Sequence, residues 1–149
     1  MAQKHPLTKE EFDQIFGKVP RLTVEVLINT PEGIVMTKIH EGVLKGKWYI
    51  PGGTVRFGEH LTDAVRRVAE SELGIEVNVG DNIGYIEYPE IVEAGYRGWP
   101  VGMVFETTIK RGELSVNDEG EEVRCFKATP PNTVESQADF LGKYLSKKT

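Results

Sequence analysis

Alternating and apolar runs of residues predict a series of strands in this chain. Residues 22–28 are rich in Val, Leu and Ile, and turn-forming residues at 31–33 separate them from a second run at 34–39, which we expect to return antiparallel. Turn chemistry at 80–82 predicts a break between two further strands. These two and the remaining predicted strands are residues 75–79, 83–88, 101–109 and 123–126.

Helical patterns occur near both ends of the chain. Thr8, with Glu11 three residues later, forms a capping-box sequence that predicts a short helix reaching about Gly17. An amphipathic pattern over residues 134–145 predicts a second helix close to the carboxyl end.

A central helix is predicted after Glu59. At about 100° per residue its apolar side chains fall on one stripe, and Gly74 is expected to end it. The stripe consists of Leu61, Ala64, Val65 and Val68. Strands on both sides of one central helix predict a single α/β domain over residues 1–149, with a mixed sheet between helical layers.

Two carboxylates on this helix have different expected environments. Glu72 lies four residues after Val68, near the middle of the apolar stripe, whereas Glu70 falls on the opposite side and is expected to be exposed. A carboxylate on an apolar stripe needs a proton, an arginine or a metal ion to compensate it. The alternative is that the last helical turn has already emerged into solvent.

Composition and charge narrow the class of function. The chain has 149 residues, 39% of them hydrophobic and 28% charged, and a net charge of −5, which disfavours bulk binding to nucleic acid. An acidic protein that handles phosphates needs metal ions or a few placed arginines. Cys125 is the only cysteine, the first residues lack an apolar signal region, and no run approaches the ~20 apolar residues of a membrane span. We therefore expect a cytoplasmic protein with no membrane partner.

The segment 52–75 carries the candidate chemistry. Gly53 is followed after five residues by Glu59, Glu59 after seven more by Arg67, and Glu72, Gly74 and Ile75 close the run. This spacing resembles the box of the Nudix hydrolases, G-x5-E-x7-R-E-U-x-E-E-x-G-U, in which U is a bulky apolar residue. The resemblance covers roughly residues 20–128 and implies the α/β/α sandwich of that family.

The resemblance also implies a site for Mg²⁺ or Mn²⁺. In the family, carboxylates of the helix and a glycine carbonyl of the preceding loop bind the cation, which here means Glu72 and Gly52. Arg67 in the family orients neighbouring glutamates, and Glu59 is its expected partner or a further metal ligand. Because Glu72 is then the sole helix carboxylate at the cation, we expect the metal and the substrate diphosphate to bind synergistically.

Two family glutamates are missing, since the chain has Val68 and Ser71 in their places. The GDP-mannose mannosyl hydrolases, a branch whose box shows the same two losses, are similar to this chain also in the GKWYIPGG and ELG sequences. That branch attacks the sugar carbon with a histidine base from a later loop, and its arginines hold the diphosphate. Here Gly120 stands at the histidine position, and the arginines would fall near Ile39 and Thr54.

The acidic loop at 117–122 offers substitutes for the missing groups. Glu119 matches the metal-ligand position of the mannosyl hydrolase branch best, and Glu121 is the other candidate base. The alternative for both residues is that they belong to a solvated acidic surface without a role in the site.

Candidate substrate contacts lie between two predicted strands. Tyr96, Arg97 and Trp99 combine aromatic rings with a guanidinium, which suits base stacking and phosphate binding. Trp99 has core or dimer packing as an alternative, so a homodimer is a further expectation.

These features predict a Mg²⁺-dependent Nudix hydrolase that acts on a small molecule, a nucleoside diphosphate linked to another group. A nucleotide sugar is the leading candidate substrate. Two alternatives stay open. One is a nucleoside triphosphate or ADP-ribose pyrophosphohydrolase. The other is a Nudix-fold module that binds a nucleotide without hydrolysing it.

Overall fold

A mixed sheet forms the centre of the molecule in the computed structural model, which describes residues 5–115 and 122–148. The described residues form the following elements in chain order: α1 (Lys9–Phe16), β1 (Arg21–Thr30), β2 (Gly33–Lys38), β3 (Trp48–Tyr49), β4 (Gly52–Thr54), α2 (Leu61–Leu73), β5 (Glu76–Glu87), α3 (Pro89–Glu93), β6 (Pro100–Arg111), β7 (Glu122–Phe126) and α4 (Glu135–Lys147).

The sheet has seven strands, with the order β3-β2-β1-β6-β5 along its main path. Only the β1–β6 pairing is parallel among these strands in the described part of the chain, and it runs from Arg21 opposite Pro100 to Asn29 opposite Thr108. Two strands lie off the main path: β4 pairs with the first half of β1, and β7 pairs with β2. The predicted mixed sheet is therefore confirmed.

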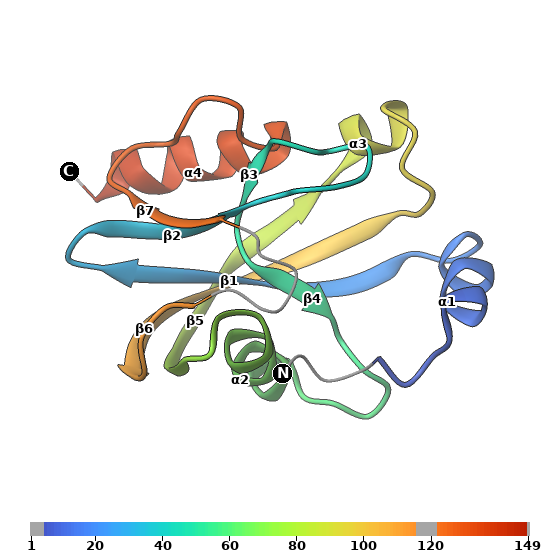
Figure 1. Cartoon of the computed structure of the whole chain (residues 1–149), viewed down its shortest axis with the longest axis horizontal. Coiled ribbons are helices and arrows are strands. Elements are labelled where there is room, and N and C mark those ends of the chain that lie inside the picture. The colour runs from blue at the N-terminus through green and yellow to red at the C-terminus, as the bar shows by residue number, and fades with distance from the viewer. Residues whose placement is uncertain (1–4, 116–121, 149) are drawn as a thin grey trace.

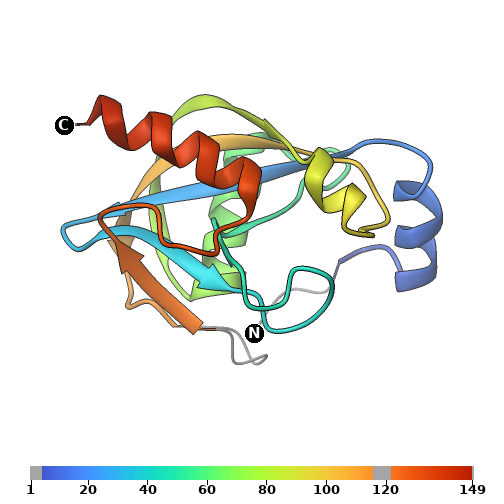
Figure 2. The same cartoon turned by 90° about the horizontal axis from the view of Figure 1, so that it is seen from above.

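Helices cover both faces of the sheet, as the predicted α/β/α sandwich requires. In Figure 1, α2 lies below the sheet and α4 with α3 lies above it, and Figure 2 shows α4 crossing the upper face. Alternation along β1 divides its side chains between the two layers. Val24, Val26 and Ile28 pack in the core between the sheet and α2, whereas Leu27 belongs to the core between the sheet and α4.

The predicted helix ends are confirmed at the residue level. The Thr8 hydroxyl accepts from the backbone N–H of Glu11 at 3.1 Å, and the Glu11 carboxylate accepts from the N–H of Thr8 at 3.0 Å. Gly74 ends α2 with φ of 68°, a left-handed conformation that glycine adopts without a steric penalty. No helix of the described residues is long and apolar enough to cross a bilayer.

The predicted turn at residues 80–82 is wrong. β5 runs without a break from Glu76 to Glu87, and it stays paired with β6 through register shifts between Val79 and Asn82 and between Asn82 and Gly84. Such bulges place extra residues opposite the partner strand, so turn-forming residues are accommodated within a bent strand. The short helix α3, which begins at Pro89, was not predicted.

Candidate functional site

The glycine strand β4 lies between the two layers of the molecule. Gly53 pairs with Val24, and a Cβ atom at Gly53 would lie 2.9 Å from Cγ2 of Val68 on α2. Gly52 pairs with Glu25, and a Cβ atom at Gly52 would lie 2.6 Å from the Val24 carbonyl oxygen and would collide with the Glu25 carboxylate. Both positions therefore admit only glycine without displacement of their neighbours, one on each face of the strand.

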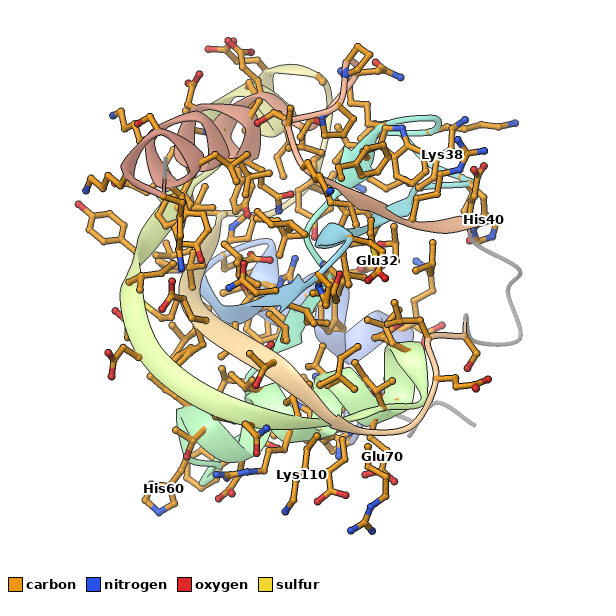
Figure 3. The ribbon with its side chains drawn as sticks, turned by 90° about the vertical axis from the view of Figure 1, so that its left-hand side faces the viewer. Glu32, Lys38, His40, His60, Glu70 and Lys110 are labelled. Atoms are coloured by element: carbon orange, nitrogen blue, oxygen red, sulfur yellow. The ribbon has the colours of Figure 1, made fainter. Side chains whose placement is uncertain are left out.

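Val68 and Ser71 use their side chains for packing and local bonding. Val68 is 1% exposed and fills the space beneath Gly53. The Ser71 hydroxyl donates to the carbonyl of Val68, three residues earlier, at 3.5 Å. Glu72 is half-buried, whereas Glu70 is exposed, as predicted, and points away from the sheet in Figure 3.

Arg67 and Glu59 form a bidentate ion pair beside β4. The Nε and Nη2 atoms of Arg67 lie 2.7 and 2.9 Å from the two carboxylate oxygens of Glu59, and both side chains are about 85% buried, with 16% and 15% exposed. Nη2 also donates to the Thr54 carbonyl at 2.9 Å, and Glu59 accepts from the N–H of Arg56 at 3.0 Å. The Arg67 guanidinium lowers the pKa of Glu59, so this carboxylate is a fixed anion. The predicted pairing is present, and the catalytic role of the two residues stays a prediction.

A cavity of about 220 Å³ opens on the side of β4 that faces away from α2, between the sheet and the layer of α3 and α4. Its wall includes both glycines of β4 together with several polar side chains. These polar side chains are Arg21, Thr23, Glu25, Tyr49, Tyr88, Tyr96 and Gln137.

A buried carboxyl, Glu25, lies at the base of this cavity. One of its oxygens accepts from the Thr23 hydroxyl at 3.2 Å and from the Tyr88 hydroxyl at 3.0 Å. Gln137 of α4 donates to the same Tyr88 oxygen at 2.9 Å, and its own amide oxygen accepts from the N–H of Ile50 at 2.6 Å. Burial raises the pKa of Glu25 to about 7, although the hydrogen bonds from Tyr88 and Thr23 oppose the change. The cavity therefore contains a carboxyl that exchanges its proton near neutral pH.

Arg21 stands at the mouth of the same cavity. Its Nη1 donates to the Thr54 hydroxyl at 2.8 Å, and its Nη2 donates to the Tyr96 hydroxyl at 2.6 Å. The guanidinium carbon also lies 5.3 Å from the centre of the Phe12 ring. These contacts fix the guanidinium next to the end of the glycine strand.

Sequence reasoning missed Glu25 and Arg21, because neither belongs to the box. A signal was available, since the polar residues Arg21, Thr23 and Glu25 alternate with apolar residues in the first half of β1. Alternate residues share one face of a strand, so these three side chains share the face that lines the cavity.

The predicted substrate residues separate in the structure. Tyr96 lines the cavity, whereas Arg97 and Trp99 are absent from its wall, and Trp99 is 42% exposed. Glu119 and Glu121 lie outside the described residues. Within the described ranges, no group of three or more His, Cys, Asp or Glu side chains is arranged to hold a metal ion.

The fold and site define an α/β/α domain in which the glycine strand β4 lies between a polar cavity and helix α2. The chain belongs to the Nudix family, because residues 19–146 match the family described as NUDIX domain.

Individual relatives agree with this assignment. The low-salt glycan biosynthesis protein Agl8 of Haloferax volcanii is 29% identical over 139 residues, which cover 91% of this chain and 86% of that protein. The ADP-ribose pyrophosphatase of Methanocaldococcus jannaschii is 29% identical over 107 residues, or 72% of this chain and 62% of that protein. The crystal structure of a MutT protein from Methanosarcina mazei superposes with a TM-score of 0.73 at 19% identity, over 87% of this chain and 96% of that one, and supports the fold.

Proposed function

We propose that the protein is a divalent-cation-dependent hydrolase of a nucleoside diphosphate linked to another group, with a nucleotide sugar as the leading substrate. One observation carries the proposal: β4 faces the polar cavity through Gly52 and contacts α2 through Gly53. In the proposed complex, a ligand held in the cavity extends beside β4 toward α2, which carries Glu72.

The backbone of β4 offers a carbonyl group at this crossing. Pro51 accepts from the N–H of Val26 at 2.7 Å, and ladder bonds alternate along an antiparallel pair, so the carbonyl of Gly52 points away from β1. Thr54 lies two residues after Gly52, so its carbonyl also points away from β1, and it accepts from Arg67 of α2. The direction of the Thr54 carbonyl supports Gly52 as an oxygen ligand on the α2 side.

The course of α2 supports Glu72 as the accompanying carboxylate. α2 runs antiparallel to β4, because Val68 lies against Gly53 while Arg67 contacts the residue after Gly53. Glu72 lies one turn beyond Val68, about 6 Å further along the helix axis. Because α2 runs opposite to β4, Glu72 is displaced from the level of Gly53 toward Gly52.

This donor set fits a hard divalent cation such as Mg²⁺ or Mn²⁺. Mg²⁺ commonly takes one or two protein carboxylates and completes its octahedron with water and phosphate oxygens. When bound, the cation would neutralise diphosphate charge and polarise the bond that breaks. Glu72 and the Gly52 carbonyl are the proposed ligands, with Glu119 as a third, while the Arg67–Glu59 pair fixes the geometry of α2 against β4.

The paired absence of carboxylates at Val68 and Ser71 favours a nucleotide sugar, because the similar mannosyl hydrolase branch shows the same absences. The Haloferax volcanii relative is named as a glycan biosynthesis protein, which also favours a nucleotide sugar. The Methanocaldococcus jannaschii relative is an ADP-ribose pyrophosphatase, which makes ADP-ribose the second candidate substrate.

A substrate panel separates these possibilities. Purified protein is incubated with nucleotide sugars, nucleoside triphosphates and ADP-ribose in Mg²⁺ or Mn²⁺, and products are separated by chromatography. Free sugar with a nucleoside diphosphate indicates attack at carbon, and two monophosphates indicate attack at phosphorus. Saturable nucleotide binding without turnover of any compound would contradict the enzymatic proposal and identify a binding module.

Matched variants test the proposed ligand and base. Glu72→Gln should abolish turnover, whereas Glu70→Gln, which removes an exposed carboxylate from the same helix, should leave it unchanged. Glu119→Gln and Glu121→Gln distinguish the two candidates of the acidic loop, since loss of the base lowers kcat by about 100-fold or more. Full activity in Glu72→Gln would remove that residue from the site.

Cooperative binding gives a test that needs no turnover. A site with one helix carboxylate should bind Mg²⁺ weakly alone and more tightly once a diphosphate supplies further oxygens. Calorimetric titration of Mg²⁺ with and without a nucleoside diphosphate measures this coupling. Equal affinities in the two titrations would contradict the shared site.

A further inference from the structure

We propose that Arg21, on the cavity face of β1, binds the diphosphate of the substrate. The inference rests on the proposed function, because it names a group that holds the substrate of that same site. Arg21 lies outside the box, more than thirty residues before Gly53.

The placement of Arg21 follows from strand geometry. Alternation along β1 directs Arg21, Thr23 and Glu25 to one face, and all three line the cavity. Thr23 is the register partner of Thr54, so the side chain of Thr54 lies on this same face. Arg21 reaches along it until Nη1 is 2.8 Å from the Thr54 hydroxyl.

Arg21 is held by neutral groups. Its two side-chain hydrogen bonds within residues 5–115 and 122–148 go to the hydroxyls of Thr54 and Tyr96, and no carboxylate of these residues lies within ion-pair distance of it. A guanidinium has five N–H donors in a planar fork that matches two phosphate oxygens. Arg21 therefore has no salt-bridge partner among these residues and keeps further donors at the cavity wall, in a fixed orientation.

Two arginines bracket the end of the glycine strand. Arg67 binds the carbonyl of Thr54 at 2.9 Å, and Arg21 binds its hydroxyl. Glu59 neutralises Arg67 through the bidentate pair, so of these two arginines Arg21 is the one whose charge is available to a ligand. A diphosphate bound in the cavity beside Thr54 would lie next to this guanidinium.

A purely structural role for Arg21 makes a different prediction. The guanidinium also contacts the Phe12 ring of α1 and could serve as a tie between that helix and the sheet. A tie should affect stability and the binding of all ligands alike. A phosphate-binding group should affect only ligands that carry phosphate.

Calorimetry on the full chain distinguishes the two roles. Wild type, Arg21→Gln and the control Arg66→Gln, an exposed arginine paired with Asp63 on α2, are titrated with ADP, GDP and UDP in Mg²⁺, and with the matching nucleosides. Loss of a charge-assisted contact should weaken nucleoside diphosphate binding by about 10- to 100-fold in Arg21→Gln, with nucleoside binding unchanged. Arg66→Gln should bind both ligands as the wild type does.

A double variant that relocates the charge distinguishes loss of the guanidinium from a folding defect as the cause of weaker binding. The double variant Arg21→Gln, Thr54→Arg places a guanidinium on the same face of the neighbouring strand and should regain most of the diphosphate affinity. Unchanged diphosphate affinity in Arg21→Gln, equal losses for nucleoside and diphosphate, or no recovery in the double variant would each overturn the assignment of Arg21 alone. Failure of the wild type to bind any nucleoside diphosphate would overturn the proposed function and this inference with it.

Discussion

Glu25 should make the stability of the protein depend on pH near neutrality. Burial raises its pKa from the usual 4.5 to about 7. Between these values the folded protein keeps a proton that the unfolded chain has lost, so stability falls as pH rises. At about 1.36 kcal/mol per pH unit, the interval corresponds to roughly 3 kcal/mol, present in full below pH 4.5 and lost once the pH passes about 7.

Substitution of Glu25 by Gln isolates this contribution. Gln keeps the acceptor for Tyr88 and Thr23 but cannot ionise, so its free energy of unfolding should lack this slope. Urea unfolding of wild type and variant between pH 4.5 and 8 measures the difference, in which all other titrations cancel. The difference should change by roughly 3 kcal/mol in favour of the variant as pH rises. Glu87→Gln, which removes an exposed carboxylate from β5, controls for the lost charge.

A constant difference between the two unfolding free energies would contradict a raised pKa of Glu25. If the two unfolding free energies stay parallel within about 0.5 kcal/mol across this range, Glu25 does not hold its proton more tightly when folded. The cavity would then contain a permanently ionised Glu25 carboxylate, which would repel a diphosphate.

Two predictions concern the contact between β4 and α2. Arg67→Met should destabilise the protein by about 3 kcal/mol, because it leaves the Glu59 carboxylate largely buried without its partner, and Arg67→Met with Glu59→Met should recover part of that loss in urea unfolding. Gly53→Ala should cost about 1–3 kcal/mol, since the new Cβ atom would lie 2.9 Å from Cγ2 of Val68. Val68→Ala in the same chain should make the combined loss smaller than the sum of the single losses in a double-mutant cycle, and strict additivity would contradict a direct clash.

The elements with a strong hydrophobic period were predictable, and those held by tertiary pairing were not. The capping box at Thr8 and the apolar stripe of α2 are local signals, and the structure confirms both. The sequence predicts two strands in place of β5, because Gly80, Asp81 and Asn82 favour turns locally. Its pairing with β6 overrides that preference through bulges, and no local pattern reports a pairing partner.

The site was predictable only where its residues share one short segment. The resemblance to the family box implied that Arg67 pairs with Glu59 or that Glu59 is a further metal ligand, and the structure shows the pair. The cavity is assembled from segments as distant as Arg21 and Gln137, so its composition depends on the topology of the sheet. Alternation of polar residues in β1 showed which side chains share a face, but it did not show that this face is hollow.

The proposed function divides ligand binding and bond cleavage between opposite sides of β4. Arg21 and Glu25 lie on the cavity side, whereas Val68 lies on the α2 side, so the absence of a glutamate at 68 leaves the cavity unchanged. Val68 in turn packs directly under Gly53, which fixes the strand that lies between cavity and helix. Under the proposed function, the loss of carboxylates on α2 affects which bond is broken, whereas residues of β1, β4 and α4 that line the cavity affect how tightly a ligand is bound. We therefore expect substitutions in the cavity wall to change ligand affinity, and substitutions on the α2 side to change turnover.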